Sequence, residues 1–111
     1  MDLKQTNLLF LLIAALLEAG GDAIVRLGLH ASATITRMIL FATAALVLFA
    51  YAYAVNAPPW DFGRLLGVYV VFFFVVAQGI SWIVFHQGPS MTVWIGGSFI
   101  VAGGIIISFN A

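Results

Sequence analysis

The chain has 111 residues, of which 64% are hydrophobic and only 7% are charged, and its mean hydropathy is +1.16. Soluble domains carry about 25% charged residues, so four basic and four acidic side chains are too few to cover a water-facing surface. This composition excludes an ordinary soluble enzyme and a disordered tail, and the lack of a basic patch excludes a nucleic-acid binder. The chain has no cysteine, which excludes disulfides and thiolate metal sites. We therefore expect lipid to be its main solvent.

Four apolar stretches predict four transmembrane helices. A helix needs about 20 apolar residues to cross the hydrocarbon, and stretches near that length cover residues 8–25, 36–55, 65–85 and 92–109. Backbone polar groups cannot stay unpaired in lipid, which favours helices over irregular chain. The breaks are short, so consecutive helices are antiparallel and both termini lie on one side. The predicted fold class is an all-α membrane protein, with residues 1–111 forming a single four-helix transmembrane domain.

Four helices enclose little space, so a solute site between two copies of the chain is expected. The predicted assembly is an antiparallel or dual-topology homodimer. Membrane orientation follows the distribution of Lys and Arg, and here Lys4 and Arg64 fall on one side while Arg26 and Arg37 fall on the other. This balance leaves two interpretations open. Either other signals fix a single orientation, or copies insert both ways up.

A charged face on the first predicted helix is the most informative feature of the sequence. Glu18, Asp22 and Arg26 are spaced i, i+4 and i+8, so they lie on one side of that helix. Glu18 lies about 15 Å beyond Leu8 along the helix, near the bilayer midplane. An acidic residue at this depth costs a few kcal/mol and usually faces a bundle interior or a wet cavity.

Each acidic residue of this face has two possible roles. Removal from water penalises an ionised carboxyl group, which suits Glu18 to bind and release a proton and, when ionised, to attract a cationic solute. Two Glu18 side chains brought together in a dimer would titrate as a unit. Alternatively, Glu18 stays protonated and only hydrogen-bonds neighbouring helices. Asp22 either forms an ion pair with Arg26 near the membrane edge or is a second proton or substrate site.

Glycines mark two further regions. Gly20 and Gly21 lie just beyond Glu18, where small residues allow close helix approach and keep space open beside the carboxyl group. In the fourth stretch, two glycine pairs repeat seven residues apart and predict a helix–helix contact surface, within one chain or between copies. The members of these two pairs are Gly96, Gly97, Gly103 and Gly104.

The remaining polar and aromatic residues favour binding over catalysis. Tyr69 offers a hydroxyl group and a π face to a cationic solute, although packing against lipid would also explain an aromatic residue there. His30 and His86 are far apart and do not indicate a metal site. The chain has no nucleophile–base set, P-loop or nucleotide fingerprint. We therefore expect neither an enzyme nor a bound cofactor.

The chain resembles the small multidrug resistance family of the drug/metabolite transporter superfamily. The resemblance rests on Glu18, Gly21 and Arg26 in the first helix. It continues from the third helix into the fourth through a series of residues in register with the family, namely Ser81, Trp82, Phe85, Gln87, Ile95, Gly96, Ala102, Gly103 and Ile106. The segment from Gly67 to Val70 is similar to a divergent branch, the YnfA-type small membrane proteins.

This resemblance implies a dimeric proton-coupled antiporter in the bacterial inner membrane. Such a protein exports small organic cations, often aromatic ones, by alternating access, a process known as multidrug efflux. Glu18 takes the family's role of shared proton and substrate site. Tyr69 falls where the family has a Trp that packs on the substrate, and Leu66 falls where it has a functional Tyr. The implied partners are the organic cation, protons, membrane lipid and a second copy or a paralogue.

Two alternative functions stay open. The stretch with His86, Trp94, Gly96 and Gly103 is similar to the subunits that flip a lipid-linked sugar, aminoarabinose, although those lack the first-helix Glu. Many glycines and aromatic residues also suit helix docking. The chain could on that basis be a structural small subunit of a larger membrane complex.

Overall fold

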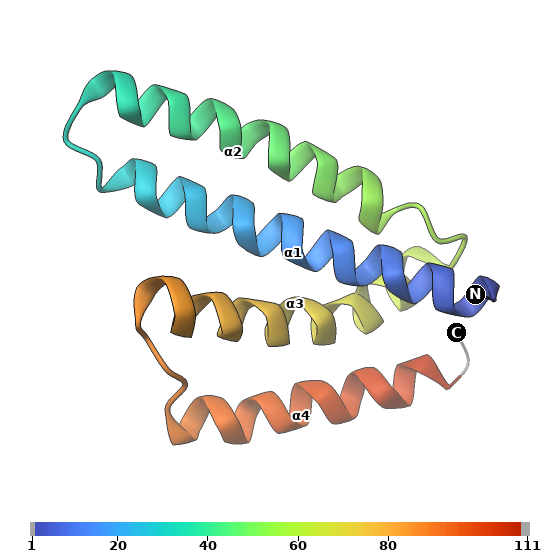
Figure 1. The fold of residues 1–111 in the computed structure, drawn as a ribbon. Coiled ribbons are helices and arrows are strands. Elements are labelled where there is room, and N and C mark those ends of the chain that lie inside the picture. Colours follow the sequence, from blue (N-terminus) through green and yellow to red (C-terminus); the bar gives the residue numbers. More distant parts are fainter. Residues whose placement is uncertain (1, 110–111) are drawn as a thin grey trace.

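The fold consists of four helices, as the computed structural model shows for residues 2–109. They are α1 (Leu3–Leu29), α2 (Thr34–Val55), α3 (Phe62–Phe85) and α4 (Met91–Ser108), and residues 2–109 contain no strand (Figure 1). All four are long and apolar enough to cross a membrane. The predicted fold class is therefore confirmed, and the chain is an all-α integral membrane protein.

The first helix is longer at both ends than the apolar stretch 8–25 that predicts it. It begins at Leu3 because Asp2 caps it: the Asp2 side chain accepts a hydrogen bond from the Gln5 backbone N–H, and the Gln5 side chain accepts one from the Asp2 N–H. At the other end the helix continues past Arg26 to Leu29, since no proline or turn interrupts it before His30. The apolar stretch shows which residues can lie in lipid, whereas the capping residue determines where the helix itself begins.

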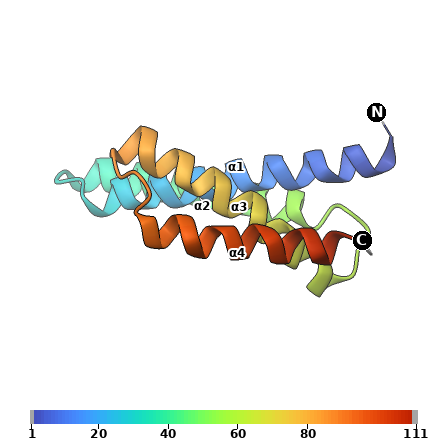
Figure 2. The same ribbon diagram turned by 90° about the horizontal axis from the view of Figure 1, so that it is seen from below.

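The four helices form an uneven bundle with α1 near its centre. α1 packs against both α2 and α3, whereas α4 packs mainly against α3 (Figures 1 and 2). The start of α1 and the end of α4 lie at the same end of the bundle, while the α1–α2 and α3–α4 loops lie at the opposite end. Most of the packing of α4 within one copy of the chain therefore comes from α3.

The apolar core fills only one half of the contact between α1, α2 and α3. Leu11, Ala14 and Ala15 of α1 are fully buried. They meet core residues from the end of α2 and the first half of α3, namely Ala54, Val55, Leu65, Val68 and Tyr69. Alanines let the helices approach closely here. Toward the loop end, α1 and α3 separate (Figure 1).

Candidate functional site: a polar groove between α1 and α3

Glu18 lies near the middle of α1, at the boundary between the packed half of the bundle and the half that opens. Its side chain is half-buried, and its Oε1 accepts a hydrogen bond of 2.7 Å from the Tyr69 hydroxyl of α3. Tyr69 is only 4% exposed. The carboxyl group therefore faces the interior of the bundle, and its bonding partner is a neutral hydroxyl group.

The Tyr69 ring is held between two other aromatic rings. Its centroid lies 5.8 Å from that of Tyr51 on α2 and 6.3 Å from that of Phe73 on α3. This packing fixes the direction of the Tyr69 hydroxyl toward Glu18. Sequence reasoning missed Tyr51, because Tyr51 and Tyr53 both occur in a uniformly apolar helix and no pattern distinguishes them. Only the fold turns Tyr51 inward and leaves Tyr53 76% exposed.

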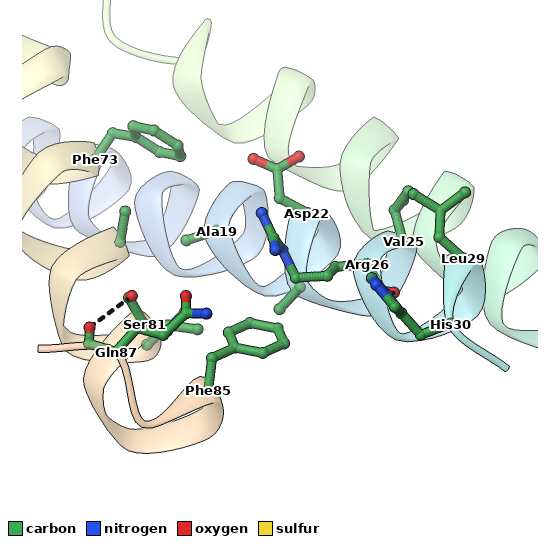
Figure 3. A pocket seen from close by; sticks show the side chains of 13 residues that line it. Ala19, Asp22, Val25, Arg26, Leu29, His30, Phe73, Ser81, Phe85 and Gln87 are labelled. Atoms are coloured by element: carbon green, nitrogen blue, oxygen red, sulfur yellow. Dashed lines mark hydrogen bonds between the residues drawn. The ribbon is translucent and has the colours of Figure 1, made fainter.

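Beyond Glu18, an open groove of about 480 Å³ runs between α1 and α3 toward the loops (Figure 3). Small side chains on both helices, such as Ala19 and Ala77, leave this space unfilled. The polar lining residues are Asp22, Arg26, His30, Ser81 and Gln87, and the aromatic ones are Phe73 and Phe85. The groove thus combines apolar walls with charges of both signs.

The ion pair expected between Asp22 and Arg26 is not formed. Both residues are exposed and line the groove, but within residues 2–109 no salt bridge joins them. The Arg26 guanidinium instead lies over the Phe85 ring of α3, 5.5 Å from its centroid. The long, planar Arg side chain stacks well on an aromatic face, and the end of α3 brings that face within its reach. The interpretation of Asp22 as a second binding residue stays a prediction.

The mouth of the groove is formed by two helix ends. His30 caps α1, and its Nδ1 lies 2.8 Å from the Arg26 carbonyl oxygen. A carbonyl can only accept, so Nδ1 carries the proton. At the end of α3, the Ser81 hydroxyl donates to the Gln87 carbonyl oxygen at 2.8 Å, and the Gln87 backbone N–H donates to the Ser81 carbonyl at 2.9 Å. These bonds place Gln87 beside the groove.

The four glycines of α4 do not form one contact surface. Gly97 and Gly104 are buried against α3, where an added Cβ would meet Phe74 and Val71 respectively. At Gly96 and Gly103, an added Cβ would have no heavy atom within 4 Å. Consecutive helical residues point about 100° apart, so adjacent glycines cannot all face one neighbour. The predicted surface is therefore divided into a face that packs within the chain and a second face that is open.

The two glycines beyond Glu18 also differ. Gly21 is buried against α2, and a Cβ there would lie 2.6 Å from a methyl carbon of Leu48. Gly20 has open space beside it. Gly21 therefore allows α1 and α2 to approach closely. The space at Gly20 does not open beside the carboxyl group, because residues two apart in a helix point to nearly opposite sides.

Comparisons with known proteins give no match: no family model, no curated protein and no solved structure is similar to the chain at a significant level. Within the part of the chain that the structure describes, no group of three His, Asp or Glu side chains is placed to hold a metal ion. The functional argument therefore depends on the geometry of Glu18, Tyr69 and the groove.

Proposed function

We propose that the protein is a proton-coupled transporter of the small multidrug resistance type, which exports small organic cations by alternating access as a homodimer. The observation that carries this proposal is the position of Glu18. It is an acidic residue near the middle of a membrane-spanning helix, it faces the bundle interior, and it bonds to the Tyr69 hydroxyl at 2.7 Å. An acidic group is costly at this depth and usually marks an ion or substrate pathway.

Exchange of a proton for a cation follows from competition at one carboxyl group. An ionised Glu18 is neutralised either by a proton or by a cationic solute, and both cannot occupy it together. The Tyr69 hydroxyl donates to the ionised carboxylate, and its oxygen can accept from the protonated acid. The Glu18–Tyr69 contact can thus persist while the proton is exchanged, which keeps the site in place through the cycle.

The groove beside Glu18 suits an organic solute. Asp22 supplies a second negative charge one helical turn away, and the rings of Phe73 and Phe85 supply apolar and π surface for the body of a cation. A volume of about 480 Å³ falls in the range of small-molecule sites. In alternating access, α1 and α3 would close this end of the groove and open the end that the apolar core now fills.

The proposed partner is a second copy of the chain, or a paralogue, in a bacterial inner membrane. The open face of α4 supports this part of the proposal. Gly96 and Gly103 lie on it together with the exposed side chains of Ile95, Phe99 and Ile106. Small residues flanked by large apolar ones favour close helix–helix contact in lipid.

Transport by purified protein in liposomes tests the role of Glu18. With a proton gradient and tetraphenylphosphonium as the solute, the wild type should accumulate the cation and Glu18→Gln should abolish accumulation. Glu18→Asp, which keeps an acidic group, should retain part of the activity. Asp61→Asn is the matched control, because Asp61 is an exposed acid at the opposite end of the bundle, and it should transport normally. Normal transport by Glu18→Gln would contradict the proposal.

A further inference from the structure

Two opposite charges face the groove without forming a salt bridge to each other. Asp22 and Arg26 lie one turn apart on α1, which is about 6 Å along the helix axis. Figure 3 shows both side chains rising from the same side of α1. Within residues 2–109 no salt bridge joins them, and the Arg26 guanidinium is held over the Phe85 ring instead. Each charged group can therefore accept a separate partner from a ligand.

Arg26 is unfavourable for a ligand that carries only positive charge. A cation that moves from the loop end toward Asp22 must pass the guanidinium, which repels it. His30, the next residue along the same face, cannot supply a compensating negative charge. A ligand that also carries an anionic group meets attraction from both Asp22 and Arg26. A guanidinium is well suited to bind a carboxylate or phosphate.

We propose that the groove binds zwitterions, with the ammonium group of the ligand at Asp22 and its anionic group at Arg26. The apolar part of the ligand lies against Phe73 and Phe85, which line the same groove. This inference rests on the proposed transport function and narrows its substrate class. The matching chemistry is an ammonium group joined to an anionic group by a short chain. A soluble amino-acid betaine has it, and so does the headgroup of a zwitterionic phospholipid.

Two probes that differ by a single charge test this inference. The first is trimethylammonium butanoate, a quaternary amine joined to a carboxylate by three methylenes. The second is butyltrimethylammonium, which has the same amine and a similar chain but no carboxylate. Binding is measured by calorimetry on the full-length protein in nanodiscs of phosphatidylglycerol. The wild type should bind the zwitterion about tenfold more tightly, the effect of one added charge-assisted hydrogen bond.

Variants of Arg26 decide whether the preference comes from this residue. Arg26→Gln should bind both probes equally, and Arg26→Lys should keep part of the preference. Arg37→Gln is the matched control, because Arg37 is at the same end of the bundle and lies over its own aromatic ring, Phe41, at 5.9 Å. It should behave as the wild type. Butyltrimethylammonium should bind Arg26→Gln at least as tightly as the wild type because the repelling guanidinium is gone, and circular dichroism checks that this variant is folded.

Changing the lipid composition of the nanodiscs shows whether the bound zwitterion is a lipid headgroup or a soluble compound. If a phospholipid headgroup is the occupant, adding phosphatidylcholine to the nanodiscs should weaken binding of the soluble zwitterion in the wild type and not in Arg26→Gln. If binding is unchanged, the occupant is the soluble compound. Equal affinity of the wild type for both probes, or a preference that persists in Arg26→Gln, overturns the inference. Neither result touches the role of Glu18, which is tested with a cation and a proton gradient.

Discussion

Helix α3 makes two contacts of opposite character. Toward α4 it presents Gly67, Val71 and Phe74, which meet Ile107, Gly104 and Gly97 in a tight apolar contact. Toward α1 it presents Tyr69, which holds Glu18, and Phe73 and Ala77, which line the open groove. The two sets are spaced by three or four residues, so each occupies its own side of the helix. Between α3 and α4, each glycine lies opposite a large side chain and the contact is closed. Between α1 and α3, small side chains such as Ala77 leave the groove open.

The largest expected loss of stability comes from a substitution in the tight contact between α3 and α4. Gly104→Leu should destabilise the protein by about 3 kcal/mol, because the new side chain would overlap Val71 and press toward the Gly67 backbone. Gly103→Leu places the same side chain in open space and should change stability by less than about 0.5 kcal/mol. Denaturation in detergent, under conditions that keep the chain monomeric, measures both. Equal losses would show that the two faces of α4 do not differ.

The next effect on stability concerns the hydrogen bond that joins Tyr69 of α3 to Glu18 of α1. Tyr69→Phe removes a hydroxyl that donates at 2.7 Å and keeps the packed ring. It should cost about 2 kcal/mol of unfolding free energy, because the half-buried carboxyl group of Glu18 loses its hydrogen-bond partner. Tyr53→Phe removes a hydroxyl from a residue that is 76% exposed, and it should be nearly neutral. The same detergent denaturation compares the two, and a neutral Tyr69→Phe would contradict the assigned contact.

A smaller effect should follow from filling the groove. Ala77→Leu places an isobutyl group in the open space between α1 and α3. It should lower the transport rate for organic cations about tenfold, equivalent to about 1.4 kcal/mol, while stability changes little because the space is not packed. Ala50→Leu, at an exposed position on α2, is the control for added bulk. Transport at the wild-type rate by Ala77→Leu would place the solute pathway elsewhere.

The smallest effect on stability concerns the short segment that joins α3 to α4. His86 ends this helix in the left-handed region, with φ of 57°, which glycine adopts without a steric cost. His86→Gly should therefore stabilise the protein by about 1 kcal/mol. His30→Gly changes the other loop-end histidine, which has an ordinary φ of −99°, and should give no gain. Thermal unfolding measures both, and a loss of stability in His86→Gly would contradict the argument.

Much of the fold could be predicted from the sequence, but less of the site could. Apolar stretches identify the helices because every residue in lipid must be apolar or costly, and its backbone must be hydrogen-bonded within the same segment. Spacing on one helix places Glu18 and Asp22 on one side because helical geometry is fixed. The partner of Glu18 could not be predicted, because Tyr69 lies 51 residues away. Of the two roles left open for Asp22, the ion pair with Arg26 is not formed, because Phe85 at the end of another helix offers Arg26 a competing contact.

By itself, the sequence determined that this is a membrane protein of four helices and that an acidic residue lies near the middle of the first. Both properties depend on local hydrophobicity and on the regular period of one helix. Only the tertiary structure decided which glycines of α4 pack inward, which tyrosine meets Glu18, and where a groove stays open. These depend on how far and at what rotation two helices approach, and that is decided by all the side chains between them together.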